Sequence, residues 1–110
     1  MQSDMKVAYA MISDFKRGTI PTGTDISEEQ QRLIHMLSED LEIQSQGSTI
    51  EQLILLVSRA DSIWNNRVAT TIDRFYSLQE AGNLVEAEKT RETFIRECPS
   101  AWYCNIVSSL

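Results

Sequence analysis

From Ser48 to Ala81 the sequence contains neither glycine nor proline, and this uninterrupted stretch constrains the fold more than any other feature. Apolar residues recur along it in steps of three and four, which is the spacing of an amphipathic helix. A second helix follows, because Gly82 can end the first one, Asn83 can cap the next, and Pro99 can end it. The sequence therefore predicts a helical hairpin with its turn at Gly82.

The middle of this stretch is less favourable for a helix. Asp61-Ser62 and Asn65-Asn66 are poor helix formers, so residues 49–81 form either one helix or two. A single helix would be close to coiled-coil length in a small domain. We expect a kink or short break near residues 61–66, and we expect Trp64 in the core.

Two helices are expected before this stretch. Residues 4–17 carry apolar residues at helical spacing and stop at Gly18, and residues 18–25 have the composition of a turn-rich loop. Ser27 and Gln30 have the spacing of a capping box, in which each side chain bonds the backbone of the other. The helix that this box opens is predicted to bury Leu33, Ile34, Leu37 and Leu41.

The remaining helix starts are predicted at three polar residues, Ser48, Asn83 and Ser100. Ser48 and Glu51 have the spacing of a second capping box. The helix over about residues 84–97 is predicted to present Leu84, Ala87, Arg91 (through its stem), Phe94 and Ile95 to its partner. A short terminal helix over residues 100–109 is predicted to bury Trp102, Ile106 and Val107.

Length and composition agree with a helical fold. With 110 residues, 42% of them hydrophobic, the chain can build one core but not two. Four glycines and two prolines are too few for an all-β sandwich, which needs a turn about every 8–12 residues. We predict an all-α protein: a compact single-domain bundle of five or six helices over residues 1–110, with a C-terminal helical hairpin.

The net charge of −6 is concentrated in one segment. Residues 18–52 contain seven acids and one base, Arg32, while acids and bases balance in the rest of the chain. An acidic surface repels nucleic acid and anionic lipid and favours a basic partner. The basic residues Arg59, Arg67 and Arg74 are interspersed with acids, so we expect no nucleic-acid partner. The alternative is that the acidic segment only keeps a small domain in solution.

No recognisable catalytic or metal site is present. His35 lacks partners for zinc, which needs several Cys or His ligands. Cys98 and Cys104 have no His or Lys nearby in sequence to lower a thiol pKa, and we expect both as thiols. The carboxylates of residues 39–42 sit at a polar helix end, where an acid/base role is not expected. We therefore predict that the protein is not an enzyme and binds no metal and no cofactor.

The sequence also predicts where the protein acts. It has no run of about 18 apolar residues, which a membrane span requires, and residues 1–18 are too polar for a signal peptide. We expect a cytoplasmic protein without a membrane partner.

Two resemblances support these predictions. Gly82, Ala87 and Pro99 have the spacing found in the second helix of a tetratricopeptide repeat, although Arg74-Phe75 replaces the expected Leu-Gly in the first helix. Nearly the whole chain resembles the bacterial DUSAM domain, through residues 74–78 (RFYSL), Ala81-Gly82-Asn83-Leu84 and the following Ala87. It departs from that pattern at residues 98–102. This resemblance implies the fold and a small non-catalytic protein, with no established activity.

These observations favour a protein that acts by binding another protein. One hypothesis is an immunity protein or antitoxin that neutralises a bacterial toxin, a basic toxin domain for instance, through its acidic surface. The alternative is a structural or adaptor module that binds a partner through a hydrophobic groove. Tyr103 must point to a different face from Trp102, so we expect it to be exposed. The residues predicted to contact the partner are Glu28, Glu29, Glu39, Asp40, Glu42 and Tyr103.

Overall fold

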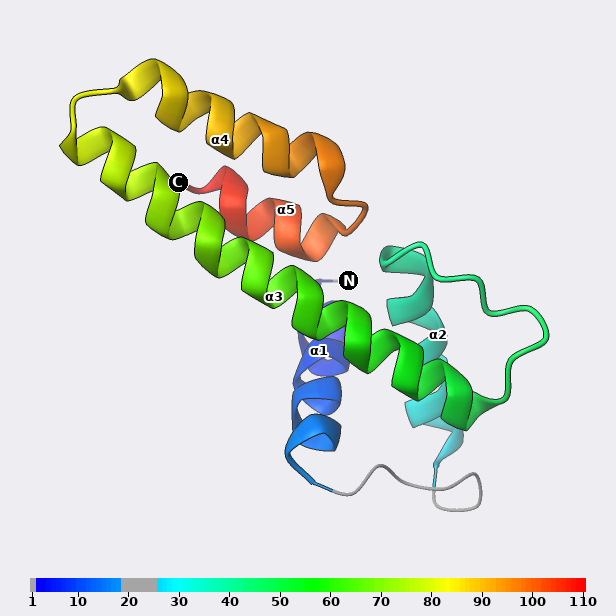
Figure 1. Ribbon diagram of the computed structural model, residues 1–110. Coiled ribbons are helices and arrows are strands. Elements are labelled where there is room, and N and C mark those ends of the chain that lie inside the picture. Colours follow the sequence, from blue (N-terminus) through cyan, green and yellow to red (C-terminus); the bar gives the residue numbers. More distant parts are fainter. Residues whose placement is uncertain (1, 19–25) are drawn as a thin grey trace. The chain divides into compact units, whose positions relative to one another are not determined.

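A computed structural model describes residues 2–18 and 26–110 of the chain. These residues form five helices and no strand (Figure 1), which confirms the predicted all-α fold. The helices are α1 (Gln2–Arg17), α2 (Glu28–Asp40), α3 (Ile50–Glu80), α4 (Leu84–Glu97) and α5 (Ala101–Ser108). The predicted loop over residues 18–25 lies outside the described residues except for Gly18.

The chain divides into two compact units, Met1–Asp61 and Ser62–Leu110, and the boundary between them falls within α3. The first unit contains α1, α2 and the beginning of α3. The second unit contains the rest of α3 together with α4 and α5. That residues 1–110 form a single domain stays a prediction.

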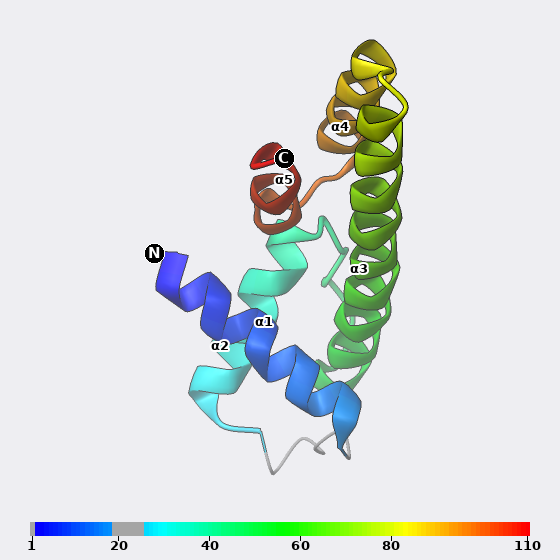
Figure 2. The same cartoon turned by 90° about the vertical axis from the view of Figure 1, so that its left-hand side faces the viewer.

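The core of the first unit is built from one apolar face of each helix. α1 and α2 lie against each other (Figure 2), and the first turns of α3 contribute further buried residues. Burying a leucine or isoleucine side chain contributes about 1.5–3 kcal/mol. The predicted core positions of α2 are confirmed. The buried residues include Ala8, Tyr9, Ile12, Leu33, Ile34, Leu37, Leu41, Leu53, Ile54 and Val57.

Capping boxes open both α2 and α3. Ser27 Oγ accepts a hydrogen bond from the Gln30 N–H at 3.1 Å, and the Ser27 N–H donates to Gln30 Oε1 at 2.9 Å, as predicted. At α3 the prediction is wrong by one residue. Thr49, not Ser48, exchanges these bonds with Gln52, at 3.2 and 3.0 Å. Because glutamine serves as well as glutamate in the box, two overlapping boxes compete and sequence spacing cannot rank them.

α3 is one helix, so the predicted break near residues 61–66 is wrong. Asp61 is only 2% exposed, and its carboxylate accepts a hydrogen bond from Lys16 Nζ at 2.5 Å. Asp and Asn each cost at most about 0.7 kcal/mol in a helix interior. The ion pair of the buried Asp61 with Lys16 and the buried side chains of Val57 and Val68 on either side outweigh that cost.

The predicted hairpin turn is confirmed at Gly82, which has a left-handed backbone with φ of 80°. The Gly82 N–H donates to the Gln79 carbonyl at 3.0 Å, and the Asn83 N–H donates to the Leu78 carbonyl at 2.8 Å. These are the two bonds of a Schellman motif. The Asn83 side chain then caps α4 by accepting from the Glu86 N–H at 3.4 Å.

In the second unit, α4 lies beside α3 and α5 lies against α4 (Figures 1 and 2). Trp64 is half-buried rather than fully buried, and its ring meets Phe94 edge-on with centroids 5.8 Å apart. Leu84 and Ile106 are 64% and 39% exposed, so their predicted core positions are wrong. Leu84 is the first residue of α4, next to the turn. The core residues here include Val68, Phe75, Ala87, Phe94, Tyr103 and Val107.

Candidate functional site

α2 and the residue pair after it carry all five carboxylates predicted to contact a partner. Glu28 and Glu29 lie in the first turn of α2, where negative charge complements the helix dipole. Glu39 and Asp40 end the helix, and Glu42 follows it. A helix rises 1.5 Å per residue, so Glu28 and Glu39 are about 16 Å apart along the axis. The structure therefore separates the acids into two groups.

Three of these acids are exposed and unengaged. Within the described part of the chain, the side chains of Glu28, Glu39 and Glu42 make no ion pair or hydrogen bond. Eleven residues span about three whole turns, so Glu28 and Glu39 lie on the same side of α2. These three residues form the acidic face, the name used for them below.

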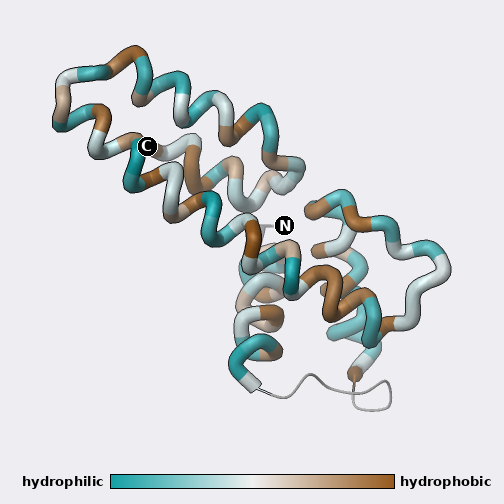
Figure 3. Tube along the Cα trace, in the orientation of Figure 1, coloured by the Kyte–Doolittle hydropathy of each residue, from teal (hydrophilic) through white to brown (hydrophobic). Residues whose placement is uncertain are grey.

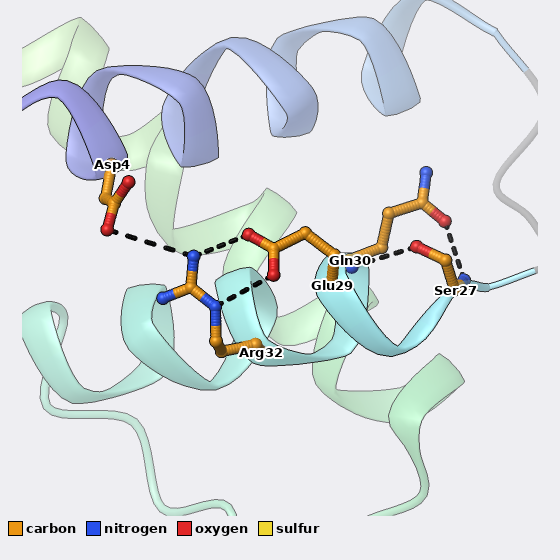
Figure 4. Close-up of polar contacts among 5 residues, drawn as sticks. All are labelled: Asp4, Ser27, Glu29, Gln30 and Arg32. Atoms are coloured by element: carbon orange, nitrogen blue, oxygen red, sulfur yellow. Dashed lines mark hydrogen bonds and ion pairs between the residues drawn. The ribbon is translucent and has the colours of Figure 1, made fainter.

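Glu29 has a protein partner already. Its carboxylate accepts two hydrogen bonds from Arg32, from Nε at 3.0 Å and from Nη2 at 2.5 Å (Figure 4). Arg32 also reaches Asp4 of α1 at 3.8 Å. The hydrogen bond from Arg32 lowers the pKa of Glu29 below 4.5, and the same bond raises the pKa of Arg32. The Glu29 carboxylate is thus already bound by Arg32, which also contacts Asp4 of α1, and it is less available to a partner than an unpaired acid.

Asp40 also has a structural role. Its Oδ2 accepts a hydrogen bond from the Tyr9 hydroxyl at 2.7 Å, and Tyr9 is 5% exposed. A buried phenol requires such an acceptor, because an unsatisfied buried hydroxyl costs about 1–3 kcal/mol. Asp40 therefore fixes α1 against the end of α2, and its carboxylate is half-buried.

Glu42 sits in an unusual backbone conformation. Its φ is 55°, in the left-handed region that normally favours glycine. The Glu42 N–H donates to the Glu39 carbonyl at 3.1 Å, and the Ile43 N–H donates to the Ser38 carbonyl at 2.8 Å, so α2 ends in a Schellman motif. These two hydrogen bonds fix the backbone of Glu42, and so they fix the position from which its exposed side chain projects.

Tyr103 is not part of any surface. It is 1% exposed, so the prediction of an exposed contact is wrong. Ser100 caps α5 as predicted, accepting from the Tyr103 N–H at 3.3 Å. In the helix that follows, Tyr103 and Val107 are one turn apart and share the buried side, while Trp102 is half-buried. Sequence spacing allowed either neighbour to face inward.

His35 lies on α2 between the two groups of acids and is exposed, as expected of a surface histidine. Among the described residues, no group of three or more His, Cys, Asp and Glu side chains could hold a metal ion. Cys98 and Cys104 are free thiols, and the Cys104 thiol lies 3.4 Å from the Cys98 carbonyl oxygen.

A second surface feature is an apolar patch at the start of α3, where Figure 3 shows a hydrophobic run. Leu55 and Leu56 are 54% and 39% exposed. With Ser48, Gln52 and Arg59 they line a shallow cavity of about 320 Å³. Because Leu53, Ile54 and Val57 fill the buried side of the helix, this apolar patch faces solvent.

Comparison with family models, curated proteins and solved structures gives no match to this chain. The resemblance to the DUSAM domain therefore stays a prediction. None of the described helices has the length and apolar content that crossing a membrane requires.

Proposed function

We propose that this protein is a non-catalytic binding protein that recognises a basic protein partner through the acidic face. The observation that supports this is the exposure of Glu28 and Glu39 on one well-anchored helix, together with that of Glu42, which lies two residues beyond its end. The capping box at Ser27 and the buried residues Leu33, Ile34 and Leu37 hold that helix in place. A rigid helix keeps the carboxylates at fixed spacing, so binding does not have to order them.

The spacing of the acids fits a protein rather than a small ligand. About 16 Å separates Glu28 from Glu39 along α2, which exceeds the Debye length of about 8 Å at physiological salt. The two ends of the acidic face therefore act on separate positive charges. A standard protein interface buries about 800 Å² on each partner and easily spans both.

The proposed partner class is a basic bacterial toxin domain, which this chain would neutralise in the cytoplasm as an immunity protein or antitoxin. Charge complementarity of this kind speeds association and disfavours wrong partners. The DUSAM-like sequence pattern is in keeping with such a small bacterial protein.

The test uses charge reversal restricted to acids whose side chains make no hydrogen bond or ion pair within the described residues. Glu28, Glu39 and Glu42 are changed together to lysine, while Glu29 and Asp40 are kept because Arg32 and Tyr9 bind them. Proteins retained by the tagged wild-type chain from its native lysate are identified, and association rates are measured with the purified partner. We expect about a tenfold slower association at low salt.

The matched control changes three exposed acids of the second unit, Asp73, Glu80 and Glu92, to lysine. The control alters the net charge by the same amount as the acidic-face variant. If total charge alone steers binding, the two variants should associate with the partner at rates within about twofold of each other. The proposal requires the control to associate clearly faster than the acidic-face variant. Equal rates would contradict it.

The alternative function is that of an adaptor, and the apolar patch supports it. Replacing Leu55 and Leu56 with serine removes most of the exposed apolar surface from the cavity wall without touching the core. If this variant no longer binds the partner while the acidic-face variant still does, the apolar patch is the binding surface. The reverse result assigns recognition to the acidic face.

A further inference from the structure

The second unit contains a cavity of about 380 Å³ along the helical hairpin. α3 contributes Arg67, Thr71 and Arg74 to its lining, which are spaced four and three residues apart and so share one side of the helix. α4 contributes Glu86, Lys89, Thr90 and Thr93, which successive turns also place on one side of the helix. The cavity therefore lies between two facing rows of basic and hydroxyl side chains.

Ion pairs flank this cavity at both ends. Arg67 pairs with Glu97 at 3.0 Å, and its guanidinium lies 4.8 Å from the centre of the Trp64 ring. Towards the turn, Lys89 contacts Glu86 at a longer 3.5 Å, which leaves most of its hydrogen-bonding capacity unused. Both cations are thus oriented by the protein while remaining partly accessible.

The residues between these ends carry donors that the protein does not use. Within the described residues, the side chains of Thr71, Thr93 and Arg74 form no hydrogen bond or ion pair. Thr90 differs, because its hydroxyl donates to the Glu86 carbonyl at 2.9 Å. Phe94, which is 1% exposed, adds an apolar wall beside them.

We propose that this cavity binds a phosphate group. Two hydroxyls, a guanidinium and an ammonium from two helices supply more donors than a carboxylate with two oxygens can accept, and they suit the tetrahedral oxygens of phosphate. Three cations against Glu86 and Glu97 leave a net positive charge around the cavity, in a chain whose net charge is −6.

The experiment is an NMR titration of the full chain with orthophosphate and with phenyl phosphate, at ionic strength held constant with sodium chloride. We expect saturable shifts of the Thr71 and Thr93 amide signals. Tighter binding of phenyl phosphate indicates a phosphate ester as the ligand, and equal affinity indicates free phosphate. Succinate binding more tightly than either one would overturn the assignment to phosphate.

Matched variants separate a site from general charge attraction. Arg74→Gln should weaken phosphate binding at least tenfold, whereas Arg96→Gln removes the same charge from an exposed position outside the cavity and should change it less than twofold. Thr71→Val should weaken binding severalfold, and Thr70→Val, at an exposed neighbouring position, should not. Equal effects within either pair, or shifts that never saturate, would show that no phosphate site exists.

Discussion

Glu42 and Gly82 end their helices with the same left-handed backbone but carry different side chains. The conformation costs a residue with a Cβ atom about 1–2 kcal/mol, and glycine adopts it freely. Glu42 is one of the three acids of the acidic face. A glutamate in this strained conformation is what we expect if its side chain is needed for binding rather than for the fold.

We predict that Glu42→Gly raises the free energy of unfolding by about 0.5–1 kcal/mol, because relief of the left-handed strain exceeds the added entropy of the unfolded chain. Gly82→Ala should lower it by about 1–2 kcal/mol, with no clash involved, since nothing lies within 4 Å of the added Cβ. Urea unfolding of both variants measures these changes in the free energy of unfolding. A destabilised Glu42→Gly variant would mean that the glutamate side chain itself stabilises the fold.

Ser38 and Ser58 make a second contrast between two buried serines of the first unit. The Ser38 hydroxyl donates to the His35 carbonyl at 2.7 Å, whereas Ser58 Oγ has no hydrogen-bond partner among the described residues. Ser58→Ala should leave stability unchanged or raise it by up to about 1 kcal/mol, and Ser38→Ala should lower it by about 0.5–1.5 kcal/mol. Thermal unfolding measures the stability of both variants. An equal loss of stability in the two would contradict the predicted difference between Ser38 and Ser58.

The pair of Glu29 and Arg32 gives a prediction about pH. The folded pKa of Glu29 lies below 4.5, so its contribution to stability is complete above pH 4.5 and is lost as the pH falls through the lowered value. Arg32→Gln should move the Glu29 pKa upward, towards 4.5. NMR titration of the side-chain carboxyl signals measures it, with Glu88 as the internal control, because Arg91 keeps that pKa low in the variant.

At the scale of helices, the hairpin depends on a small residue where α4 meets its neighbours. Ala87 is 1% exposed, while Ala69 on α3 is exposed. Ala87→Leu should therefore lower the free energy of unfolding by roughly 1–3 kcal/mol through overpacking, and Ala69→Leu should change it by less than about 0.5 kcal/mol. Similar melting temperatures for the two variants would show that Ala87 is not at a close approach.

Helix stops and caps were predictable because their causes are local. Gly82, Asn83, Ser27 and Ser100 act on neighbouring backbone groups, and the structure has all four in their predicted roles. The continuity of α3 was not predictable in this way. Its reason is the pairing of Asp61 with Lys16, a partner far away in the sequence.

The candidate site was predictable only in part, for the same reason. The sequence places the acids on α2, but it does not reveal that Tyr9 and Arg32 already engage two of them. It also missed the row formed by Arg67 and Arg74, because six residues separate these bases in the sequence, Asp73 among them, and only the helical repeat of α3 places them on one side. The side that Tyr103 faces depends on the three-dimensional contacts of α5 rather than on its spacing.

At the scale of the whole molecule, charge is divided unequally between the two units. Residues 1–61 contain ten acids and five bases, and residues 62–110 contain six acids and five bases, so the net charges are −5 and −1. The acidic face belongs to the first unit and the basic cavity to the second. The two proposed binding activities can therefore be altered independently by mutation.

Both tryptophans of the chain, Trp64 and Trp102, belong to the second unit, and this makes intrinsic fluorescence a selective probe. Selectively excited tryptophan fluorescence follows the unfolding of that unit, whereas far-ultraviolet circular dichroism follows the helices of both. Because α3 runs unbroken through the unit boundary, we expect the two denaturation curves to coincide, as they do for a single cooperative transition. If the curves separate, the long helix can fray in its middle, and each half of the protein melts on its own.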